Sequence, residues 1–215
     1  MIASMTRRLA LFAMAAFLAI PPLALPVPAL ADPQDDALVA KAVSYLDGLL
    51  AAKGTFRQTD PKGVTVTGTF YLARPGRARF QYDPPSGLLI TSDGKTVIMS
   101  DSYLKTFQKF PLGSTPLALF LADHIRLDKG AKVTRVEHNA NGFSVTARDS
   151  HGLSQGQVTL YFAEAPTRLT GWALIDAQGR ATQVALGPLS PMMQADPGLF
   201  TQTPGGQSDA TVTGR

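Results

Sequence analysis

The chain of 215 residues contains no cysteine, three histidines and a single tryptophan. Without cysteine, disulfide bonds cannot stabilise the fold, and a lipid anchor on an N-terminal cysteine is excluded. The three histidines show no metal-ligand spacing with one another or with acidic residues. A glycine-rich phosphate loop is also missing. We therefore expect no metal site and no cofactor.

Charged residues are also few, at 17% of the chain, and the formal net charge is only +4. The basic residues are scattered along the sequence, so the composition gives no reason to expect a nucleic-acid partner. Apolar residues make up 45% of the chain. This content fits either an ordinary core or a core that also contains an apolar ligand cavity.

Residues 1–31 have the features of a secretory signal peptide. Arg7 and Arg8 precede the apolar run Leu9–Ile20, and Ala29-Leu30-Ala31 is a small-residue cleavage pattern. The run of about 12 residues is shorter than the roughly 20 that a membrane-spanning helix needs, although an uncleaved anchor is the alternative. We expect cleavage after Ala31, a mature chain of net charge +2 beginning at Asp32, and a location outside the cytoplasm. Both the Sec and the twin-arginine export routes stay open.

The rest of the chain suits one domain, which we place at residues 32–204, followed by a small polar tail at 205–215 that we expect to be disordered. Residues 33–52 predict an amphipathic helix, because apolar side chains recur there at steps of three and four. These are Leu38, Val39, Ala42, Val43, Leu46, Leu49 and Leu50.

Residues 64–110 predict a series of antiparallel strands. Apolar and polar residues alternate from Val64 to Leu72 and again from Arg77 to Tyr82, as in a sheet with two unlike faces. Asp93-Gly94 separates two further segments and predicts a tight hairpin. Later segments with the same character and turn residues between them are 132–137, 142–148, 157–163, 168–176 and 180–186.

Residues 116–122 predict a short helix that is apolar on every side. Such a helix should not be exposed to water, so we expect it to lie on the apolar face of the sheet as a lid. The complete pattern predicts an α+β protein that is mainly antiparallel β. Its sheet of about ten short strands would curl into an unclosed barrel, because a flat sheet would twist and expose its edges.

Several short motifs follow one another in a definite order along residues 39–204. They are Gly54-Thr55-Phe56-Arg57-Gln58, Gly68-Thr69-Phe70, Arg74-Pro75-Gly76-Arg77-Ala78-Arg79-Phe80-Gln81-Tyr82, Pro85, Ser92-Asp93-Gly94-Lys95, Thr115-Pro116-Leu117-Ala118-Leu119-Phe120-Leu121, Asp176 to Gly179, Thr182, and Phe200 followed by Pro204. None is diagnostic alone, but the ordered set resembles the periplasmic outer-membrane lipoprotein carrier family (LolA-like).

The resemblance implies an unclosed β-barrel, capped by helices, whose apolar cavity takes up the acyl chains of lipoproteins in the periplasm. Family members receive this cargo from an inner-membrane ABC-type complex and pass it to an outer-membrane receptor lipoprotein. We expect the same partners here, and a monomer. The family's arginine in a strand-end Arg-Pro motif corresponds to Arg74, which would close the lid by hydrogen bonds to lid carbonyls. Phe80 stands where relatives often carry tryptophan, and the C-terminus beyond Phe200 is short.

The expected ligand-binding residues are the apolar members of the strands and of the lid. They are Phe70, Leu72, Phe80, Tyr82, Leu89, Ile98, Met99, Leu117, Leu119, Phe120 and Leu121, with Arg74 as the latch. Plain core packing is the alternative for the strand residues, since strand parity does not tell which side chains face a cavity. For Arg74 the alternative is a surface arginine that ends a strand.

One pattern favours catalysis. Gly152-Leu153-Ser154-Gln155-Gly156 matches the G-x-S-x-G nucleophile elbow, which needs a strand before it and a helix after it. The following residues predict a strand instead, and none of His124, His138 and His151 lies in the required order, so we expect no enzyme. Two other functions stay open: a sensor module of the same fold that binds lipid or envelope proteins, and a carrier of another lipid.

Overall fold

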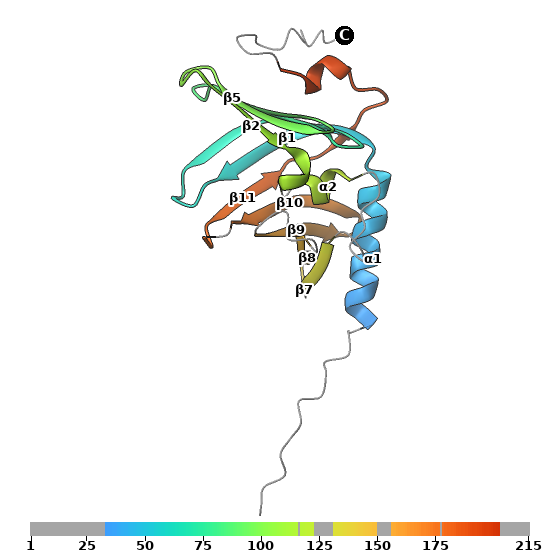
Figure 1. The fold of residues 1–215 in the computed structure, drawn as a ribbon. Helices are drawn as coiled ribbons and strands as arrows, with labels where there is room; N and C mark the ends of the chain where they lie inside the picture. The colour runs from blue at the N-terminus through green and yellow to red at the C-terminus, as the bar shows by residue number, and fades with distance from the viewer. Residues whose placement is uncertain (1–32, 116, 123–130, 150–155, 177, 203–215) are drawn as a thin grey trace, which may run out of the picture. The chain divides into compact units, whose positions relative to one another are not determined.

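The computed structural model describes residues 33–115, 117–122, 131–149, 156–176 and 178–202 (Figure 1). The predicted signal peptide and the predicted C-terminal tail lie outside these residues. Within them the strands of the first half are β1 (Ala51–Thr59), β2 (Thr65–Ala73), β3 (Arg77–Tyr82), β4 (Leu88–Asp93), β5 (Thr96–Asp101) and β6 (Thr106–Pro111). The strands of the second half are β7 (Ala131–Asn139), β8 (Gly142–Asp149), β9 (Gln157–Glu164), β10 (Thr167–Ile175), β11 (Ala181–Leu186) and β12 (Ser190–Pro191).

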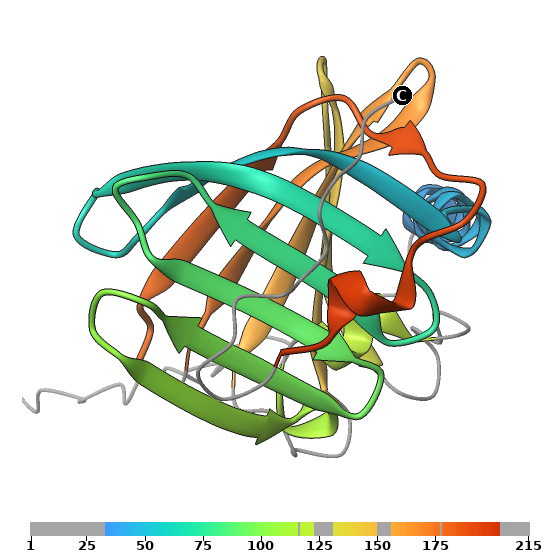
Figure 2. The ribbon, with the colours of Figure 1, turned by 90° about the horizontal axis from the view of Figure 1, so that it is seen from above.

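All these strands belong to one antiparallel sheet with the order β6-β5-β4-β3-β2-β1-β11-β10-β9-β8-β7, and β12 pairs with β1. In the described residues β6 and β7 form the two edges and do not pair with each other, so the sheet is not closed. Figures 1 and 2 show that the sheet is strongly curved. The predicted unclosed antiparallel barrel is confirmed.

Helix α1 (Pro33–Gly48) packs against β7, β8 and β10. It buries Leu38, Ala42 and Leu46, which are four residues apart and therefore share one helix face. The helix is shorter than predicted, because Ala51 and Ala52 pair with β2 and begin β1 instead. Among the described residues no helix has both the length and the apolar character needed to cross a bilayer.

The described residues also form three short helical elements: the 3₁₀ helix η1 (Leu112–Ser114), the α-helix α2 (Leu117–Leu121) and the 3₁₀ helix η2 (Pro197–Phe200). Figures 1 and 2 show α2 and η2 on opposite sides of the strands β1–β6. We call the face that carries α2 the inner face and the face that carries η2 the outer face. The helix predicted at 116–122 is thus present as α2, whereas β12 and η2 had no sequence prediction.

The main core lies on the inner face. Side chains from both halves of the sheet meet α1 and α2 there, and the buried members from the second half include Phe143, Val145, Leu160, Phe162, Trp172 and Val184. A smaller cluster on the outer face contains Ala73, Leu199 and Phe200. The apolar content of the chain therefore supplies two layers, one on each side of the same strands.

Candidate functional site

Five of the predicted site residues lie on the inner face of the sheet: Phe70, Leu72, Phe80, Tyr82 and Met99. Phe70 pairs with Phe80, Phe80 pairs with Ile90, and Ile90 pairs with Met99. Residues that pair directly in an antiparallel sheet point to the same face, so Phe70, Phe80, Ile90 and Met99 form one row across β2–β5. Leu72 lies two residues from Phe70 and shares this face. Phe70 and Leu72 are fully buried, whereas Met99, towards the sheet edge, is partly exposed.

Aromatic rings fill the centre of the inner face. Phe70 and Phe80 have ring centroids 4.8 Å apart, and each lies 5.9 Å from Trp172 of β10. Phe56 of β1 lies 5.7 Å from Phe80 and 5.0 Å from Tyr82. These rings join the first half of the sheet to the second. Phe56 and Trp172 were not among the predicted site residues, although Trp172 is the single tryptophan and lies in a predicted strand.

The Phe56 ring requires glycine at position 68. A Cβ atom at Gly68 would lie 2.6 Å from Cε1 of Phe56 and 2.2 Å from the carbonyl oxygen of Gln81, and real Cβ atoms do not approach other atoms so closely. The predicted Gly68-Thr69-Phe70 motif therefore has a packing reason on the inner face.

Tyr82 is buried at the end of β3, and its hydroxyl group donates a 2.7 Å hydrogen bond to Oε1 of Gln58. Burial raises the pKa of Tyr82 to about 12, while the hydrogen bond to Gln58 acts in the opposite direction. The phenol is therefore neutral at physiological pH and adds no charge to the apolar inner face.

Leu89 and Ile98 lie on the outer face, apart from the other predicted strand residues. Leu89 pairs with Gln81 and Ile98 pairs with Thr91. Both are offset by one residue from the inner-face row, so their side chains point to the opposite face. Their carbonyl oxygens accept hydrogen bonds from Nε2 of Gln202, at 3.3 Å and 3.4 Å. The structure does not bring these two residues together with Phe70 and Phe80.

Helix α2 covers part of the inner face. Leu121 is 1% exposed and belongs to the core, and Leu117, Ala118 and Ala122 pack against it. The side chains of Leu119 and Phe120, which were also predicted as lid residues, lie outside the described ones. The described lid contacts are therefore made by aliphatic side chains that lie on the sheet's own apolar residues.

The β2–β3 turn holds α2, and the neighbouring β4–β5 turn packs against the β2–β3 turn. The N–H of Gly76, in the β2–β3 turn, donates a 2.7 Å hydrogen bond to the carbonyl of Leu121. The Ser92 hydroxyl in turn donates to the Gly76 carbonyl at 2.6 Å. Gly76 has a φ of +74°, and a Cβ there would lie 2.5 Å from the Cα of Gly94 in the β4–β5 turn. Only glycine fits this conformation and this close approach.

Arg74 stands two residues before Gly76 and is buried. Its backbone N–H donates to the carbonyl of Leu50 at 2.8 Å, which ties the end of β2 to the α1–β1 connection. Burial lowers the pKa of the guanidinium, and the nearby carboxylate of Asp47 on α1 raises it. Arg74 is therefore not a surface arginine, and it lies in the segment that contacts the lid.

An open groove of about 480 Å³ runs along the lid at this end of the sheet. Its walls come from the two turns, η1 and α2, and consist of Pro75, Gly76, Gly94, Lys95, Leu112, Gly113, Ala118, Leu121 and Ala122. The volume falls in the range of roughly 300–1,000 Å³ that is usual for ligand pockets. Most of its lining is apolar, and among the described lining residues Lys95 supplies the one charged side chain.

The outer face of β3–β5 is covered by the end of the described chain. The buried Arg79 donates from Nη1 to the Leu199 carbonyl at 3.0 Å, and burial lowers the pKa of its guanidinium. The side chain of Gln202 donates to Oγ1 of Thr91 at 3.0 Å and accepts a 2.6 Å hydrogen bond from Ser100. This contact could not be predicted, because Gln202 follows an irregular segment rich in proline and glycine.

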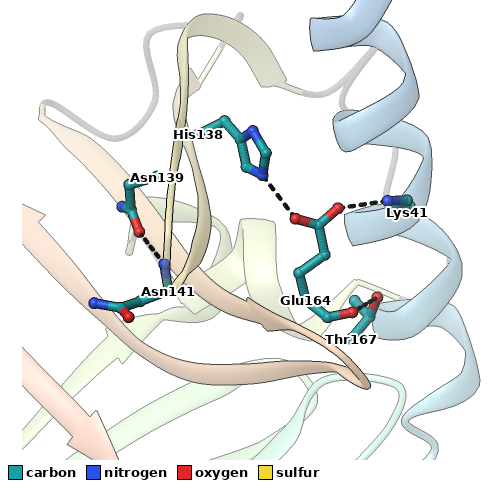
Figure 3. Close-up of polar contacts among 6 residues, drawn as sticks. All are labelled: Lys41, His138, Asn139, Asn141, Glu164 and Thr167. Atoms are coloured by element: carbon teal, nitrogen blue, oxygen red, sulfur yellow. Dashed lines mark hydrogen bonds and ion pairs between the residues drawn. The ribbon is translucent and has the colours of Figure 1, made fainter.

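A polar cluster connects α1 to β7 and β9 in the second half of the sheet (Figure 3). Glu164, at the end of β9, accepts from Lys41 of α1 at 2.6 Å and from His138 of β7 at 2.7 Å. Hydrogen bonds from Lys41 and then from His138 lower the pKa of the Glu164 carboxyl, and slight desolvation opposes them. In the described part of the chain no three acidic or histidine side chains come together as a metal ion would need.

Comparison with known proteins identifies the family. Residues 47–203 match the family model described as "Outer membrane lipoprotein carrier protein LolA". The chain belongs to this family. The expected resemblance is thereby confirmed over most of the chain, including all of the strands and α2. This is a family of carriers and not of enzymes.

Curated relatives in the carrier family have modest identity to this chain. The outer-membrane lipoprotein carrier protein of Chromobacterium violaceum is 32% identical over 111 residues, which cover 48% of this chain and 53% of that protein. The protein of the same name from Neisseria meningitidis serogroup B is 27% identical over 158 residues, covering 70% of this chain and 75% of that one. The match thus spans about half of the first relative and three quarters of the second.

Solved structures also resemble this carrier-family chain. A LolA superfamily protein from Nitrosomonas europaea aligns with a TM-score of 0.46 and 10% identity, covering 78% of this chain and 97% of that one. The MucA/MucB complex of Pseudomonas aeruginosa aligns with a TM-score of 0.42 and 14% identity, covering 79% of this chain and 61% of that one.

The surroundings of the G-x-S-x-G pattern differ from those of a nucleophile elbow. Residues 152–155 lie outside the described ones, as do His124 and His151. Gly156 is followed directly by strand β9, where an elbow would be followed by a helix. His138, the one histidine among the described residues, is hydrogen-bonded to Glu164 near α1.

Proposed function

We propose that the mature chain is a periplasmic carrier that takes up the acyl chains of lipoproteins on its inner face and moves them from the inner to the outer membrane. The observation that carries the proposal is α2, a five-residue apolar helix that lies on the inner face of an unclosed sheet. Membership of a carrier family supports the cargo class, and carriers of this family are periplasmic.

The physical basis is an exchange of apolar contacts. Transfer of an acyl chain out of water contributes about 0.8 kcal/mol for each buried methylene. When α2 moves aside, cargo chains replace Leu117 and Leu121 against the inner face, so one apolar contact is lost for each one gained. The net affinity is then much smaller than the total burial, which lets a carrier release its load. In the empty state α2 keeps the apolar face away from water.

Arg74 acts as the latch in this proposal. It is buried beside the turn whose Gly76 N–H holds the Leu121 carbonyl. A guanidinium has five donors in a fixed fork and stays charged even when partly desolvated. Hydrogen bonds from Arg74 to lid carbonyls would hold the closed state, and cargo would have to break them.

The proposal includes the partners and the route. An inner-membrane ABC-type complex would load the carrier, and an outer-membrane receptor lipoprotein would unload it. Residues 1–31 would direct export and be removed after Ala31, leaving a domain at 32–204 with a tail at 205–215. The Phe70, Phe80 and Met99 row would contact the acyl chains once α2 is displaced.

Identification of the material that co-purifies from the periplasm tests this function. The carrier should yield triacylated lipoproteins in mass spectrometry of the intact complex. In solution, a synthetic triacylated lipopeptide should displace a fluorescent C16 fatty acid from the protein, and the same peptide without acyl chains should not. Recovery of free lipid alone, or of a protein partner without acyl chains, would contradict the proposal and favour another lipid or a sensor function.

A further inference from the structure

The loop between β5 and β6 exposes two large apolar side chains next to each other. Tyr103 is 68% exposed and Leu104 is 73% exposed. Figure 2 shows this loop at the end of the strands that is remote from α1. Aliphatic and aromatic side chains that lie side by side at a loop tip are unfavourable in water. Such an exposed pair indicates contact with a membrane or a protein partner.

The tip has a fixed shape. Oδ1 of Asp101 accepts hydrogen bonds from the backbone N–H groups of Tyr103 and Leu104, at 2.9 Å and 3.0 Å. The N–H of Ser102 donates to the carbonyl of Gly87 in the β3–β4 loop at 3.1 Å. A Cβ at Gly87 would lie 2.6 Å from the Ser102 hydroxyl and 2.7 Å from the Tyr103 ring, so the two loops are in close contact.

Backbone strain marks the same place. Lys105 has a φ of 51°, and it is the only non-glycine residue with a positive φ in the described part of the chain. A left-handed conformation is unfavourable for a lysine, and such strain is concentrated at functional sites. The hydrogen bonds of Asp101 hold the turn in this form, in which Leu104 is exposed.

Charge indicates what the tip would meet. Lys105 follows the tip directly and Lys109 lies further along in β6, and Asp101 is the one acidic residue between 101 and 111, with Oδ1 already hydrogen-bonded to backbone N–H groups. The Lys109 ammonium lies 5.5 Å from the ring centroid of Phe107. Lysines beside exposed aromatic and aliphatic side chains are the composition of segments that enter the headgroup region of anionic bilayers.

We propose that the β5–β6 loop is a membrane-docking tip, which inserts Leu104 and Tyr103 into the headgroup region of an anionic bilayer while Lys105 and Lys109 contact lipid phosphates. A bilayer fits better than a protein partner, because two side chains offer far less than the roughly 800 Å² per partner of a stable protein interface. A bilayer needs no complementary pocket. This function goes beyond cargo binding, since it brings the carrier itself to a membrane surface.

Vesicle flotation tests the tip with the full mature chain. The wild-type protein should float with vesicles of phosphatidylglycerol and phosphatidylcholine, and less so with phosphatidylcholine alone or at high salt. Leu104→Ser should lower the partition coefficient about tenfold, as expected for one buried leucine. The matched control is Leu50→Ser, because Leu50 is similarly exposed at 66% but lies in the α1–β1 connection. The control should bind as the wild type does.

Several outcomes would overturn the docking tip. Absence of the wild type from floated anionic vesicles is one such outcome, and equal loss of binding in Leu50→Ser and Leu104→Ser is another. Loss of cargo handover to a purified protein receptor in Leu104→Ser, with vesicle binding unchanged, would assign the tip to a protein partner instead. Displacement of a C16 probe should be the same in both variants, so failure of the tip and failure of the carrier function are separate results.

Discussion

Arg74 combines a buried charge with a position between three elements. Its backbone N–H is bonded to Leu50, its guanidinium interacts with Asp47 of α1, and two residues later Gly76 is bonded to α2. Burial of a cation is unfavourable unless opposite charge and hydrogen bonds compensate it. The helix α1 therefore supplies the charge that allows an arginine to stay beside the lid.

Replacement of this arginine tests the latch. Arg74→Leu should retain the fold, because leucine tolerates the buried position, but it should hand cargo to the receptor poorly. We expect the transfer rate to fall about tenfold or more, since hydrogen bonds from a charged group contribute about 1.5–3 kcal/mol. Arg57→Leu, at an exposed position of β1, is the control. Unchanged handover kinetics in Arg74→Leu would remove the latch.

Tyr82 gives a prediction at high pH. Its pKa is raised to about 12 in the folded state, against about 10 in an unfolded chain. A raised pKa of an acid means that its stabilising contribution is complete below pH 10 and is lost as the pH rises towards 12. The free energy of unfolding should therefore fall more steeply above pH 10 in the wild type than in Tyr82→Phe.

The same variant has a neutral-pH effect and a control. Tyr82→Phe should be about 1 kcal/mol less stable at pH 7, because Gln58 loses its 2.7 Å hydrogen bond. Tyr103→Phe, with an exposed ring, should keep the stability of the wild type at pH 7. Equal slopes for Tyr82→Phe and the wild type would show that the Tyr82 hydroxyl titrates as in the unfolded chain.

At the scale of elements, the C-terminal segment supports the strands that hold the lid. Arg79 and Gln202 connect residues 199–202 to β3, β4 and β5 on the outer face. The turn at Gly76, which is hydrogen-bonded to α2, and the turn at Gly94, which packs on Gly76, connect these strands. The lid on one face and the C-terminal segment on the other therefore restrain one group of strands.

Removal of the Gln202 side chain measures this support. Gln202→Ala should destabilise the fold by about 1–3 kcal/mol, because Thr91 and Ser100 lose a buried partner. The measurement is urea unfolding followed by far-UV circular dichroism. Gln194→Ala, an exposed glutamine in the preceding loop, should change the free energy of unfolding by less than about 0.5 kcal/mol. Equal effects of the two substitutions would contradict a structural role for Gln202.

The strands were predictable because their signal is local. Side chains alternate between polar and apolar in β2 and β3, and Asp93-Gly94 defines a hairpin, so both the elements and their antiparallel pairing follow from the sequence. Leu89 and Ile98 could not be assigned to a face in the same way. Both faces of β4 and β5 are covered, and a strand with two covered faces loses its alternation.

The residues missed by the sequence depend on contacts between distant segments. Arg79 reads as an exposed member of a polar strand face, and it is buried only because η2 folds back over it. Trp172 joins the Phe70 and Phe80 rings only because β10 and β2 belong to the two facing halves of the sheet. Neither contact leaves a mark in local composition or periodicity.

At the scale of the described domain, the distribution of apolar surface is the main functional feature. An unclosed sheet has one large apolar face, and a short helix that belongs to the same chain covers part of it. Helix α2 is hydrogen-bonded to the β2–β3 turn at one end of the strands, while the exposed Tyr103 and Leu104 lie in the β5–β6 loop. In the proposed functions, cargo exchange and membrane contact therefore take place at different ends of the strands.

Thiol labelling of the lid tests the central claim most directly. The chain has no cysteine, so Ala118→Cys introduces one reporter on α2, where residue 118 packs against the core. A bound triacylated lipopeptide should raise the labelling rate at this position about tenfold or more, because the cargo displaces the helix. Labelling of Lys53→Cys, on the exposed side of β1, should not change. A lipopeptide that binds while the rate at position 118 stays constant or falls would contradict the movable lid.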